Sequence, residues 1–337
     1  MISSIYQLVH PRTFSVQLAD VALDSGVIVK PRYMALCHAD QRYYLGQRDA
    51  AILRKKLPMA LIHECCGQVV YDKSGAFSVG QNVVMIPNVP GAAREGEYEN
   101  YAIGARFLSS GYDGFMQEFV VLPQDRLVPF EGIPLHVSAI CEFVSVGVHA
   151  VSRFDLCAHK YRDVIAVWGD GSLAYVVTCI LKNTYKNAKI VVAGKNRTKL
   201  SYFSFVDETY LVDELPENLR FDHAFECVGS HGSFYAINDI IRHINPQGTA
   251  VLLGVSEDKV AINTRDILEK GLTMLGCSRS GRADFEKAVD FLRNNDFQRR
   301  LSAIVYESAA VESIADIHRV FAEDAGTMFK TVFEWRL

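Results

Sequence analysis

The stretch VIAVWGDGSLA, residues 164–174, decides the fold of this chain. Its first five residues are typical of a buried strand, and the next six fit the spacing G-x-G-x-x-A at the start of a helix. In such a turn the first glycine permits a tight bend, the second lets the backbone approach a pyrophosphate, and the small third residue lets the helix pack closely. We therefore expect four residues to bind a dinucleotide at the N-terminus of that helix: Gly169, Gly171, Ser172 and Leu173. A glycine-rich turn with a purely structural role is the alternative.

Strand and helix patterns alternate along the chain after this turn. Apolar runs typical of strands recur at 189–193, 223–228 and 249–255, with helical patterns near 173–185, 198–205 and 233–243. Alternation at this spacing predicts an α/β domain with a doubly wound parallel sheet. Residues 5–122 instead contain short extended runs separated by turns, which predicts a mostly-β first part. The chain ends with amphipathic helices from about residue 283 and a last strand, KTVFEW.

The composition excludes several classes of protein. Of the 337 residues, 49% are hydrophobic and 22% are charged, as in a folded protein of about two domains. A formal net charge of -4 provides no basic field for nucleic acid or an anionic membrane surface. The longest weakly polar stretch, residues 134–151, carries two histidines and a glutamate, so no transmembrane helix is expected. The N-terminus lacks the outline of a secretory signal and the eight cysteines are spread thinly, which predicts a cytoplasmic protein with reduced thiols.

Three cations follow the second predicted strand of the nucleotide-binding part. An NAD-binding site places Asp or Glu at this point to accept the ribose 2′-hydroxyl, but residues 171–206 contain no acidic residue. Lys195, Arg197 and Lys199 stand there instead, and the arginine fork suits a 2′-phosphate. The pattern therefore favours NADPH. The alternative is a solvated run of charges at the start of a helix.

Donor groups for a metal ion stand at the ends of predicted elements in the first part of the chain. Cys37 closes an extended run, His63 and Glu64 are adjacent in LIHECCG, and Glu142 stands in ICEFVSVGVHA. A thiolate, an imidazole and a carboxylate match a catalytic zinc site whose fourth position is open to water or substrate. On an extended strand His63 and Glu64 point to opposite faces, so only one is expected to reach the metal directly. We assign Cys37, His63 and Glu142 as ligands and Glu64 as an alternate ligand. A buried cysteine and a hydrogen-bonded core histidine are the structural alternative.

Several segments, which follow one another in the same order along the whole chain, resemble segments of the zinc-dependent medium-chain alcohol and polyol dehydrogenases. They are CHADQRYYLG at 37–46, His63-Glu64, GYDGFMQEFVVLP at 111–123, Glu142 with SVGVHA at 145–150, FDHAFECVG at 221–229, INPQG at 244–248 with LGV at 253–255, and LGCSRSG at 275–281. The resemblance implies a GroES-like, mostly-β catalytic domain in two pieces, 1–145 and 283–337, around a Rossmann domain, 146–282. It also implies further cofactor contacts at Val228, Gly229, Gly254, Val255 and Ser278.

Within this family, the segments DQRYYLGQRD, KLPMALIHE and WGDGSLAY look like the branch that reduces D-ribulose 5-phosphate to D-ribitol 5-phosphate with NADPH in teichoic-acid precursor synthesis. The resemblance implies an NADP-dependent zinc oxidoreductase that forms a homodimer or homotetramer. A cytidylyltransferase of the same pathway is the implied partner. Two alternatives remain: a zinc reductase of an unphosphorylated polyol or ketone, and a non-catalytic NADPH-binding protein of the same fold.

The chain departs from the broader family at two points. The loop at 88–110 lacks the four clustered cysteines of a structural zinc lobe, so one catalytic zinc ion per chain is expected. Ala39 replaces the Ser or Thr that relays a proton in the family, which leaves water at the metal, Glu64 or His38 as the proton donor. Asp40 is expected to orient a metal-bound histidine or to cap the helix that follows it.

A sugar phosphate also needs cationic or amide donors near the metal. Gln41 and Arg42 follow the ligand Cys37 closely, and Arg279 stands in the glycine- and serine-rich segment LGCSRSG. We expect Gln41, Arg42 and Arg279 to bind the substrate. The alternatives are a solvated surface position for Arg42 and a cofactor phosphate for Arg279.

Overall fold

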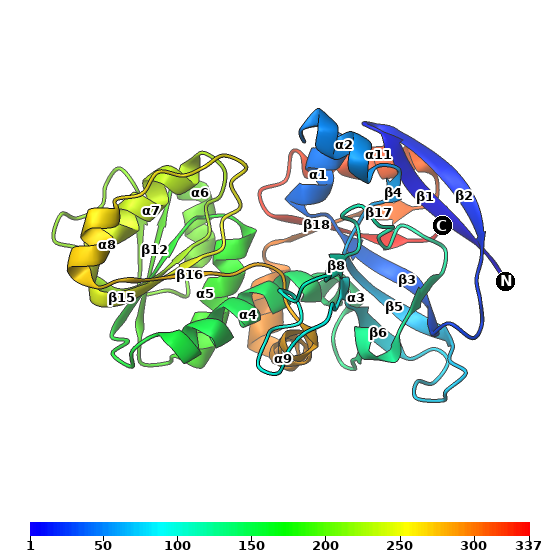
Figure 1. The fold of residues 1–337 in the computed structure, drawn as a ribbon, viewed down its shortest axis with the longest axis horizontal. Helices are drawn as coiled ribbons and strands as arrows, with labels where there is room; N and C mark the ends of the chain where they lie inside the picture. Colours follow the sequence, from blue (N-terminus) through cyan, green and yellow to red (C-terminus); the bar gives the residue numbers. More distant parts are fainter. The chain divides into compact units, whose positions relative to one another are not determined.

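The computed structural model describes all residues, Met1–Leu337, and the chain divides into two compact units (Figure 1). Unit 1 comprises Met1–Ser145 and Arg279–Leu337, and unit 2 comprises Val146–Ser278. The chain therefore leaves unit 1 and later returns to it. The return falls at Arg279, slightly before the residue 283 expected from the sequence. In neither unit does a helix combine the length and the apolar character that crossing a membrane requires.

Unit 2 contains a six-stranded parallel sheet with the order β13-β12-β11-β14-β15-β16. Its strands are β11 (Val164–Trp168), β12 (Lys189–Gly194), β13 (Glu208–Leu211), β14 (Phe221–Glu226), β15 (Ile244–Leu252) and β16 (Thr273–Gly276). Its helices include α5 (Ser172–Thr184), α6 (Arg197–Leu200), α7 (Gly232–His243) and α8 (Thr264–Lys270). The central strands β11 and β12 are almost entirely buried, as expected where both faces of a parallel sheet are covered. The predicted doubly wound parallel sheet is confirmed.

The strand order of unit 2 changes direction between β11 and β14. From β11 the chain adds β12 and β13 on one side, and then β14, β15 and β16 on the other. Trp168 at the end of β11 is opposite Ala193 of β12 and Glu226 of β14. In open parallel sheets, ligands bind beside such a reversal at the carboxyl ends of the strands. The turn from Gly169 to Gly171 follows β11 at this point.

Unit 1 is built from mostly antiparallel sheets. Its largest sheet has the order β10-β6-β5-β3-β18-β17, with β9 also paired with β3; a smaller sheet has the order β2-β1-β4, and β7 pairs with β8. The strands are β1 (Ile2–His10), β2 (Thr13–Asp20), β3 (Val27–Ala35), β4 (Met59–Ala60), β5 (Glu64–Tyr71), β6 (Asn82–Met85), β7 (Asn88–Val89), β8 (Arg106–Phe107), β9 (Val120–Leu122), β10 (Leu127–Pro129), β17 (Val305–Val311) and β18 (Lys330–Trp335). The helices are α1 (His38–Tyr44), α2 (Ala50–Lys56), α3 (Leu135–Ser138), the start of α4 (Cys141–Cys157), α9 (Arg282–Leu292), α10 (Asn295–Ser302) and α11 (Ile314–Asp324). The mostly-β character expected for the first part of the chain is confirmed.

The second piece of unit 1 completes its main sheet. β18 pairs antiparallel with β3, with Phe333 opposite Met34 and Val332 opposite Ala35, while β17 lies parallel to β18. Apolar side chains of both pieces, among them Met34, Phe333 and Trp335, share one core. The pairing brings the start of β18 to the end of β3, where the candidate metal donors stand.

Candidate active site

Three metal-capable side chains lie together in unit 1. Cys37 precedes α1 directly after β3, and Glu64 is the first residue of β5, with His63 before it. Because β3 and β5 are antiparallel, with Ala35 opposite Glu64, the end of one strand meets the start of the other. The donor atoms of Cys37, His63 and Glu64 all lie within 4.8 Å of one another. The structure thus brings these predicted donors to one point.

Both side chains of the His63-Glu64 pair reach this cluster, and the expectation that only one of them binds the metal directly stays a prediction. Ile62 has a left-handed backbone with a φ of 69°, and regular strand geometry begins only at Glu64. The alternation of an extended strand therefore does not apply to His63. A left-handed backbone is uncommon for a β-branched residue, and strain of this kind clusters at functional sites.

The cluster has the donor chemistry of a zinc site. A thiol, an imidazole and a carboxylate are all ligands that zinc accepts. Oε2 of Glu64 is buried without a hydrogen-bond partner, and a buried acceptor of this kind favours a cation beside it. Desolvation raises the pKa of the Cys37 thiol to about 12, so a metal ion has to displace the thiol proton when it binds.

Glu142 lies beside the cluster, in the first turn of α4. It is 4% exposed. Burial raises its pKa to about 8, with Glu64 and Cys37 adding to the rise and His63 opposing it. The carboxylate is therefore within electrostatic reach of the donors, although it is not one of the three that lie within 4.8 Å. Coordination by Glu142 stays a prediction, and Glu64 is the carboxylate that the structure places in the cluster.

A buried lysine that the sequence analysis did not single out completes the cluster. Nζ of Lys330, the first residue of β18, donates to the carbonyl oxygen of Leu36 at 2.8 Å and to Oε1 of Glu64. It also lies 4.5 Å from the ring centroid of Phe143. Burial alone would lower the pKa of Lys330, but Glu64 and Cys37 raise it above its ordinary value. A lysine that opens the apolar run KTVFEW was the signal available in the sequence.

Asp40 supports the cluster from the first turn of α1. Its Oδ2 accepts the N–H of Cys37 and its Oδ1 accepts the N–H of Ile62, each at 3.1 Å. Asp40 thus caps α1 and also fixes the two backbone segments that carry the metal donors. His38, in contrast, is exposed, and partial burial of its ring together with Arg42 lowers its pKa. The role of His38 as a proton donor stays a prediction.

Two of the residues expected to bind substrate lie on α1. The buried side chain of Gln41 donates from Nε2 to the carbonyl oxygen of Phe321 at 2.8 Å and to Oδ2 of Asp324 at 2.7 Å. Gln41 therefore links α1 to α11 through its amide nitrogen, and its expected contact with the substrate stays a prediction. Arg42 is partly exposed, and burial followed by the nearby Arg48 lowers its pKa. Two neighbouring cations favour an anion at this surface.

Arg279 contacts an aromatic ring that in turn contacts a residue of the metal cluster. Its guanidinium is 5.0 Å from the ring centroid of Phe107. The ring of Phe107 meets the imidazole of His63 edge to face, with 5.2 Å between centroids. The backbone of Arg279 is left-handed, with a φ of 59°. The guanidinium of Arg279 is thus separated from the metal donor His63 only by the ring of Phe107, and its backbone is strained. A cation at this position suits a substrate phosphate, and this role of Arg279 stays a prediction.

A cavity of about 300 Å³ lies at the carboxyl ends of β11, β12 and β14 in unit 2. It is lined by Trp168, Gly169, Asp170, Gly171, Ala193, Gly194, Lys195, Lys199, Val212, Cys227, Val228, Gly232, Tyr235, Ala236 and Asp239. Gly169 has a φ of 130°, which favours glycine, and a Cβ on Gly171 would meet no atom within 4 Å. The turn therefore leaves open space for an anion at the N-terminus of α5, as a dinucleotide pyrophosphate requires.

The cavity includes part of the predicted cofactor set. Gly169, Gly171, Lys195, Lys199 and Val228 line it, whereas Ser172, Leu173, Arg197, Gly229, Gly254, Val255 and Ser278 do not. Arg197 instead donates to the carboxylate of Glu214 at 2.9 and 3.2 Å in an exposed ion pair. The N–H groups of Gly229 and Gly254 donate to the carboxylate of Glu226 at the end of β14. The two lysines line the cavity and Arg197 does not, and the contact of each with a 2′-phosphate stays a prediction.

Asp170 reaches the end of β12 from the neighbouring turn. Its Oδ2 accepts the N–H of Lys195 at 2.6 Å and that of Asn196 at 2.7 Å. A Cβ on Gly194 would lie 2.6 Å from Cβ of Asp170, so this close approach requires glycine. A carboxylate therefore stands at the ribose end of the site although residues 171–206 contain none. Two N–H donors fix this carboxylate and offset its charge.

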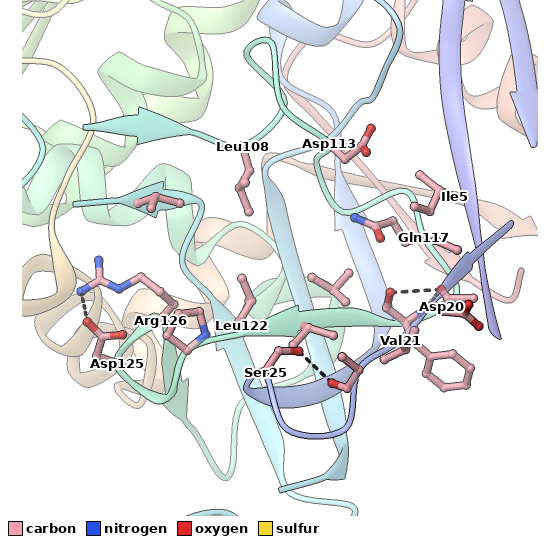
Figure 2. A pocket seen from close by; sticks show the side chains of 18 of the residues that line it. Ile5, Asp20, Val21, Ser25, Leu108, Asp113, Gln117, Leu122, Asp125 and Arg126 are labelled. Atoms are coloured by element: carbon pink, nitrogen blue, oxygen red, sulfur yellow. Dashed lines mark hydrogen bonds and ion pairs between the residues drawn. The ribbon is translucent and has the colours of Figure 1, made fainter. Parts of the chain in front are cut away.

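A second cavity, of about 600 Å³, lies in unit 1 (Figure 2). It is bordered by the β1–β2 hairpin, β9 and the segments around β7 and β8, with Ile5, Asp20, Leu108, Gln117 and Arg126 in its lining. None of the predicted metal, substrate or cofactor residues lines it.

Two protein-family models match the chain. The alcohol dehydrogenase GroES-like domain matches residues 24–133, and the zinc-binding dehydrogenase model matches residues 185–294. With the parallel sheet of unit 2, these matches confirm the predicted combination of a GroES-like domain and a Rossmann domain.

Similar proteins cover the full length of the chain. The ribulose-5-phosphate reductase of Streptococcus pneumoniae is 55% identical over 100% of this chain and 98% of its own. The ribulose-5-phosphate reductase of Bacillus spizizenii is 47% identical over 100% of both chains. Among solved structures, S. aureus TarJ in complex with NADPH superimposes with a TM-score of 0.90 at 43% identity, covering 100% of both chains.

Proposed function

The chain belongs to the zinc-dependent medium-chain dehydrogenase family, and from this premise we propose that it reduces D-ribulose 5-phosphate to D-ribitol 5-phosphate with NADPH. The observation that carries this function is the 55% identity, over the whole chain, to a reductase of that substrate. The enzyme is an NADP-dependent oxidoreductase with a zinc cofactor. Its product serves the synthesis of teichoic-acid precursors.

Each unit contributes one part of the reaction. We assign NADPH to the cavity of unit 2 and the zinc ion to the donor cluster of unit 1. Cys37, His63 and a carboxylate, from Glu64 or Glu142, would hold the ion. Zinc supplies a Lewis acid that polarises the carbonyl of the substrate.

The side chains around the cluster provide positive charge that a sugar phosphate can bind. Lys330 holds Oε1 of Glu64, and Arg42 and Arg279 provide cations for the phosphate of the substrate. Of the two side chains expected to supply the proton, Glu64 lies in the cluster and has a pKa raised by burial. This position in the cluster favours Glu64 over His38, which is exposed and is not one of the clustered donors.

The wider setting of the enzyme is part of the same proposal. A cytidylyltransferase would use the ribitol 5-phosphate that the enzyme releases, and the chain would assemble as a homodimer or homotetramer. All eight cysteines are free, which supports a reducing compartment such as the cytoplasm.

Oxidation of NADPH, followed at 340 nm, tests the function directly. We expect rapid oxidation of NADPH with D-ribulose 5-phosphate. With D-ribulose we expect much slower oxidation, because a sugar without a phosphate cannot pair with Arg42 and Arg279. Activity with ribulose and none with its phosphate would instead identify a polyol reductase. A protein that binds NADPH but holds no zinc and reduces neither sugar would be the non-catalytic alternative.

Lys199→Ala is expected to weaken NADPH binding by about 10- to 100-fold and NADH binding little, because one charge-assisted contact to the 2′-phosphate contributes about 1.5–3 kcal/mol. Lys199 lines the cavity of unit 2. Arg197→Ala is the matched control, since Arg197 pairs with Glu214 and is outside the cavity lining. Fluorescence titration with both cofactors measures the effect. Equal losses for NADPH and NADH in Lys199→Ala, or a larger preference change in Arg197→Ala, would contradict the assignment.

A further inference from the structure

Ser109 contacts the imidazole of His63 in the metal cluster. Its Oγ lies 3.0 Å from Oδ1 of Asp40 and 3.3 Å from Nδ1 of His63. A carboxylate only accepts hydrogen bonds, so the hydroxyl donates to Asp40 and its lone pair is left to accept Nδ1–H of His63. This arrangement keeps the proton of the ring on Nδ1 and leaves Nε2 free for a metal ion.

Asp40 does not orient the ring directly. Its Oδ1 lies 3.8 Å from Nδ1 of His63, which is beyond hydrogen-bond distance. The same oxygen already accepts the N–H of Ile62, and the other oxygen accepts the N–H of Cys37. The expected role of Asp40 as the orienting group is therefore carried out through the hydroxyl of Ser109.

The segment that carries Ser109 also packs against the ring of His63. Phe107 meets the imidazole edge to face, two residues before Ser109. The N–H of Leu108 donates to the carbonyl oxygen of Pro87 at 3.0 Å, and β8 pairs with β7 through Phe107 and Asn88. Ser109 itself has a left-handed backbone with a φ of 64° and is 4% exposed. A strained, buried serine persists only where its surroundings hold it.

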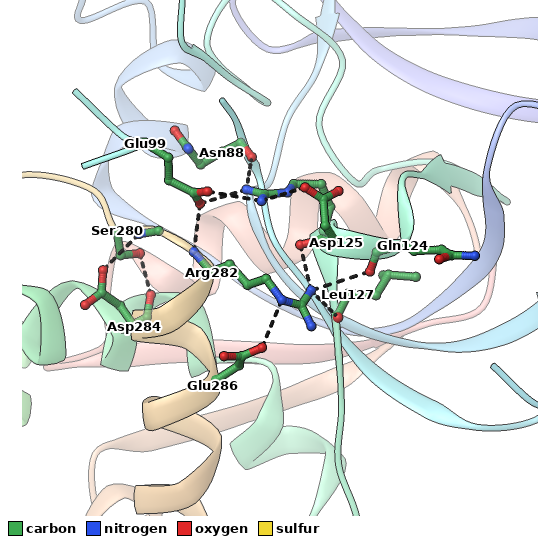
Figure 3. A network of polar contacts seen from close by, with 12 residues as sticks. Asn88, Glu99, Gln124, Asp125, Leu127, Ser280, Arg282, Asp284 and Glu286 are labelled. Atoms are coloured by element: carbon green, nitrogen blue, oxygen red, sulfur yellow. Dashed lines mark hydrogen bonds and ion pairs between the residues drawn. The ribbon is translucent and has the colours of Figure 1, made fainter. Parts of the chain in front are cut away.

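A partly buried ion pair between Arg126 and Glu99 lies beside this segment (Figure 3). The guanidinium of Arg126, whose side chain is 4% exposed, donates to the carbonyl oxygen of Asn88 at 3.1 Å and to both carboxylate oxygens of Glu99 at 2.8 and 3.2 Å. Glu99 belongs to the loop between β7 and β8, and Asn88 is the residue opposite Phe107. The ion pair thus contacts both the loop and the β7–β8 strand pair, whose strand β8 ends at Phe107, two residues before Ser109.

Glu99 also binds the second piece of unit 1. Its Oε1 accepts the N–H of Arg282, at the start of α9, at 2.7 Å. A Cβ on Gly281 would lie 2.8 Å from Cγ of Glu99, so the two segments are in close contact. The carboxylate therefore receives donors from two parts of the sequence, and Arg279, which stacks on Phe107, lies just before this contact.

We propose that Ser109 and Glu99 are positioning residues for His63, an inference that rests on the zinc site of the proposed function. Ser109 sets the tautomer and orientation of the imidazole. Glu99, through its ion pair with Arg126, holds the segment 106–109 against the imidazole. Neither residue touches the substrate or the metal ion.

Ser109→Ala tests the direct contact. We expect its dissociation constant for zinc to rise by about 10- to 100-fold, the loss typical when a partner of a metal-bound histidine is removed. Competition with a chelator measures this constant in the metal-free protein. Ser110→Ala is the matched control, because the Ser110 hydroxyl accepts from Lys56 at 2.8 Å and not from His63.

The tautomer of His63 is a readout that a merely structural role would not change. In metal-free wild type, ¹⁵N NMR of the imidazole should place the proton on Nδ1. In Ser109→Ala the signals should shift towards a mixture of tautomers, while in Ser110→Ala they should not. Wild-type affinity together with an unchanged tautomer in Ser109→Ala would overturn the proposal.

Glu99→Gln tests the remote part. We expect a zinc dissociation constant raised by about tenfold, and shifted His63 signals, because the guanidinium of Arg126 loses its charged partner in the β7–β8 loop and keeps only the adjacent Asp125. Glu286→Gln is the control, since Glu286 pairs with Arg282 at 2.9 Å on the surface of α9. Thermal unfolding of each variant identifies a protein that has lost its fold, in which case Ser109→Ala still decides. If wild type itself binds no zinc, the proposed function fails; if wild type and both variants bind it equally, only this inference fails.

Discussion

Lys330→Met is expected to lower the free energy of unfolding by about 3–5 kcal/mol, as when one partner of a buried ion pair is removed. The side chains of Lys330 and Glu64 are 6% and 0% exposed, and they form such a pair. Without the ammonium group, the carboxylate of Glu64 would be buried beside the thiol of Cys37 with no lysine to compensate it. Leu36 would also lose a donor to its carbonyl oxygen.

Urea denaturation of the metal-free protein at pH 7 measures this effect. The double variant Lys330→Met/Glu64→Gln should regain most of the stability, since it removes both buried charges. Lys73→Met is the matched control, because Lys73 and Asp24 form an ion pair with side chains 65% and 78% exposed, and its loss should change stability little. A double variant no more stable than the single one would contradict the coupling between Lys330 and Glu64.

Features that depend on neighbouring residues could be predicted from the sequence. The strand β11 and the turn at Gly169 and Gly171 follow one another within a few residues, so hydrophobic pattern and glycine spacing describe them together. The gathering of Cys37 and His63 was expected because each stands at the end of an element and has a side chain suited to a metal. Local pattern and side-chain chemistry were sufficient for these parts of the site.

Features that depend on backbone exceptions or on distant strands could not be predicted in this way. His63 lies just before β5 and follows the left-handed residue Ile62, so the alternation rule for strands does not describe the pair His63 and Glu64, whose donor atoms lie in one cluster. Lys330 lies 266 residues after Glu64, and only the pairing of β18 with β3 brings them together. Arg197 was expected at a 2′-phosphate because it follows the second strand and has a donor fork, and its ion pair with Glu214, 17 residues later, was not expected. Periodicity and spacing contain no information about such contacts.

Cys37→Ser is expected to remove the zinc ion and to lower kcat/KM for D-ribulose 5-phosphate by at least about 10³-fold, because a Lewis acid contributes several kcal/mol of transition-state stabilisation. Serine keeps the approximate size of the side chain but replaces a zinc-binding thiolate with a hydroxyl. Elemental analysis and the assay at 340 nm measure both effects. Cys157→Ser is the control, since Cys157 is an exposed cysteine of unit 2 and should leave metal content and rate unchanged. Full zinc content in Cys37→Ser would contradict the ligand assignment.

The pH dependence of zinc binding provides an independent check on Cys37. Desolvation raises the pKa of its thiol to about 12, so in the metal-free protein the thiol keeps its proton at pH 7. Zinc binds the thiolate, so binding releases that proton, and the affinity for zinc should rise with pH around neutrality. Cys37→Ser has no thiol proton to release, so its residual affinity should rise less steeply. Calorimetry in buffers of different ionisation enthalpy counts the protons released per zinc ion. Equal counts for wild type and Cys37→Ser would show that the thiol is not a ligand.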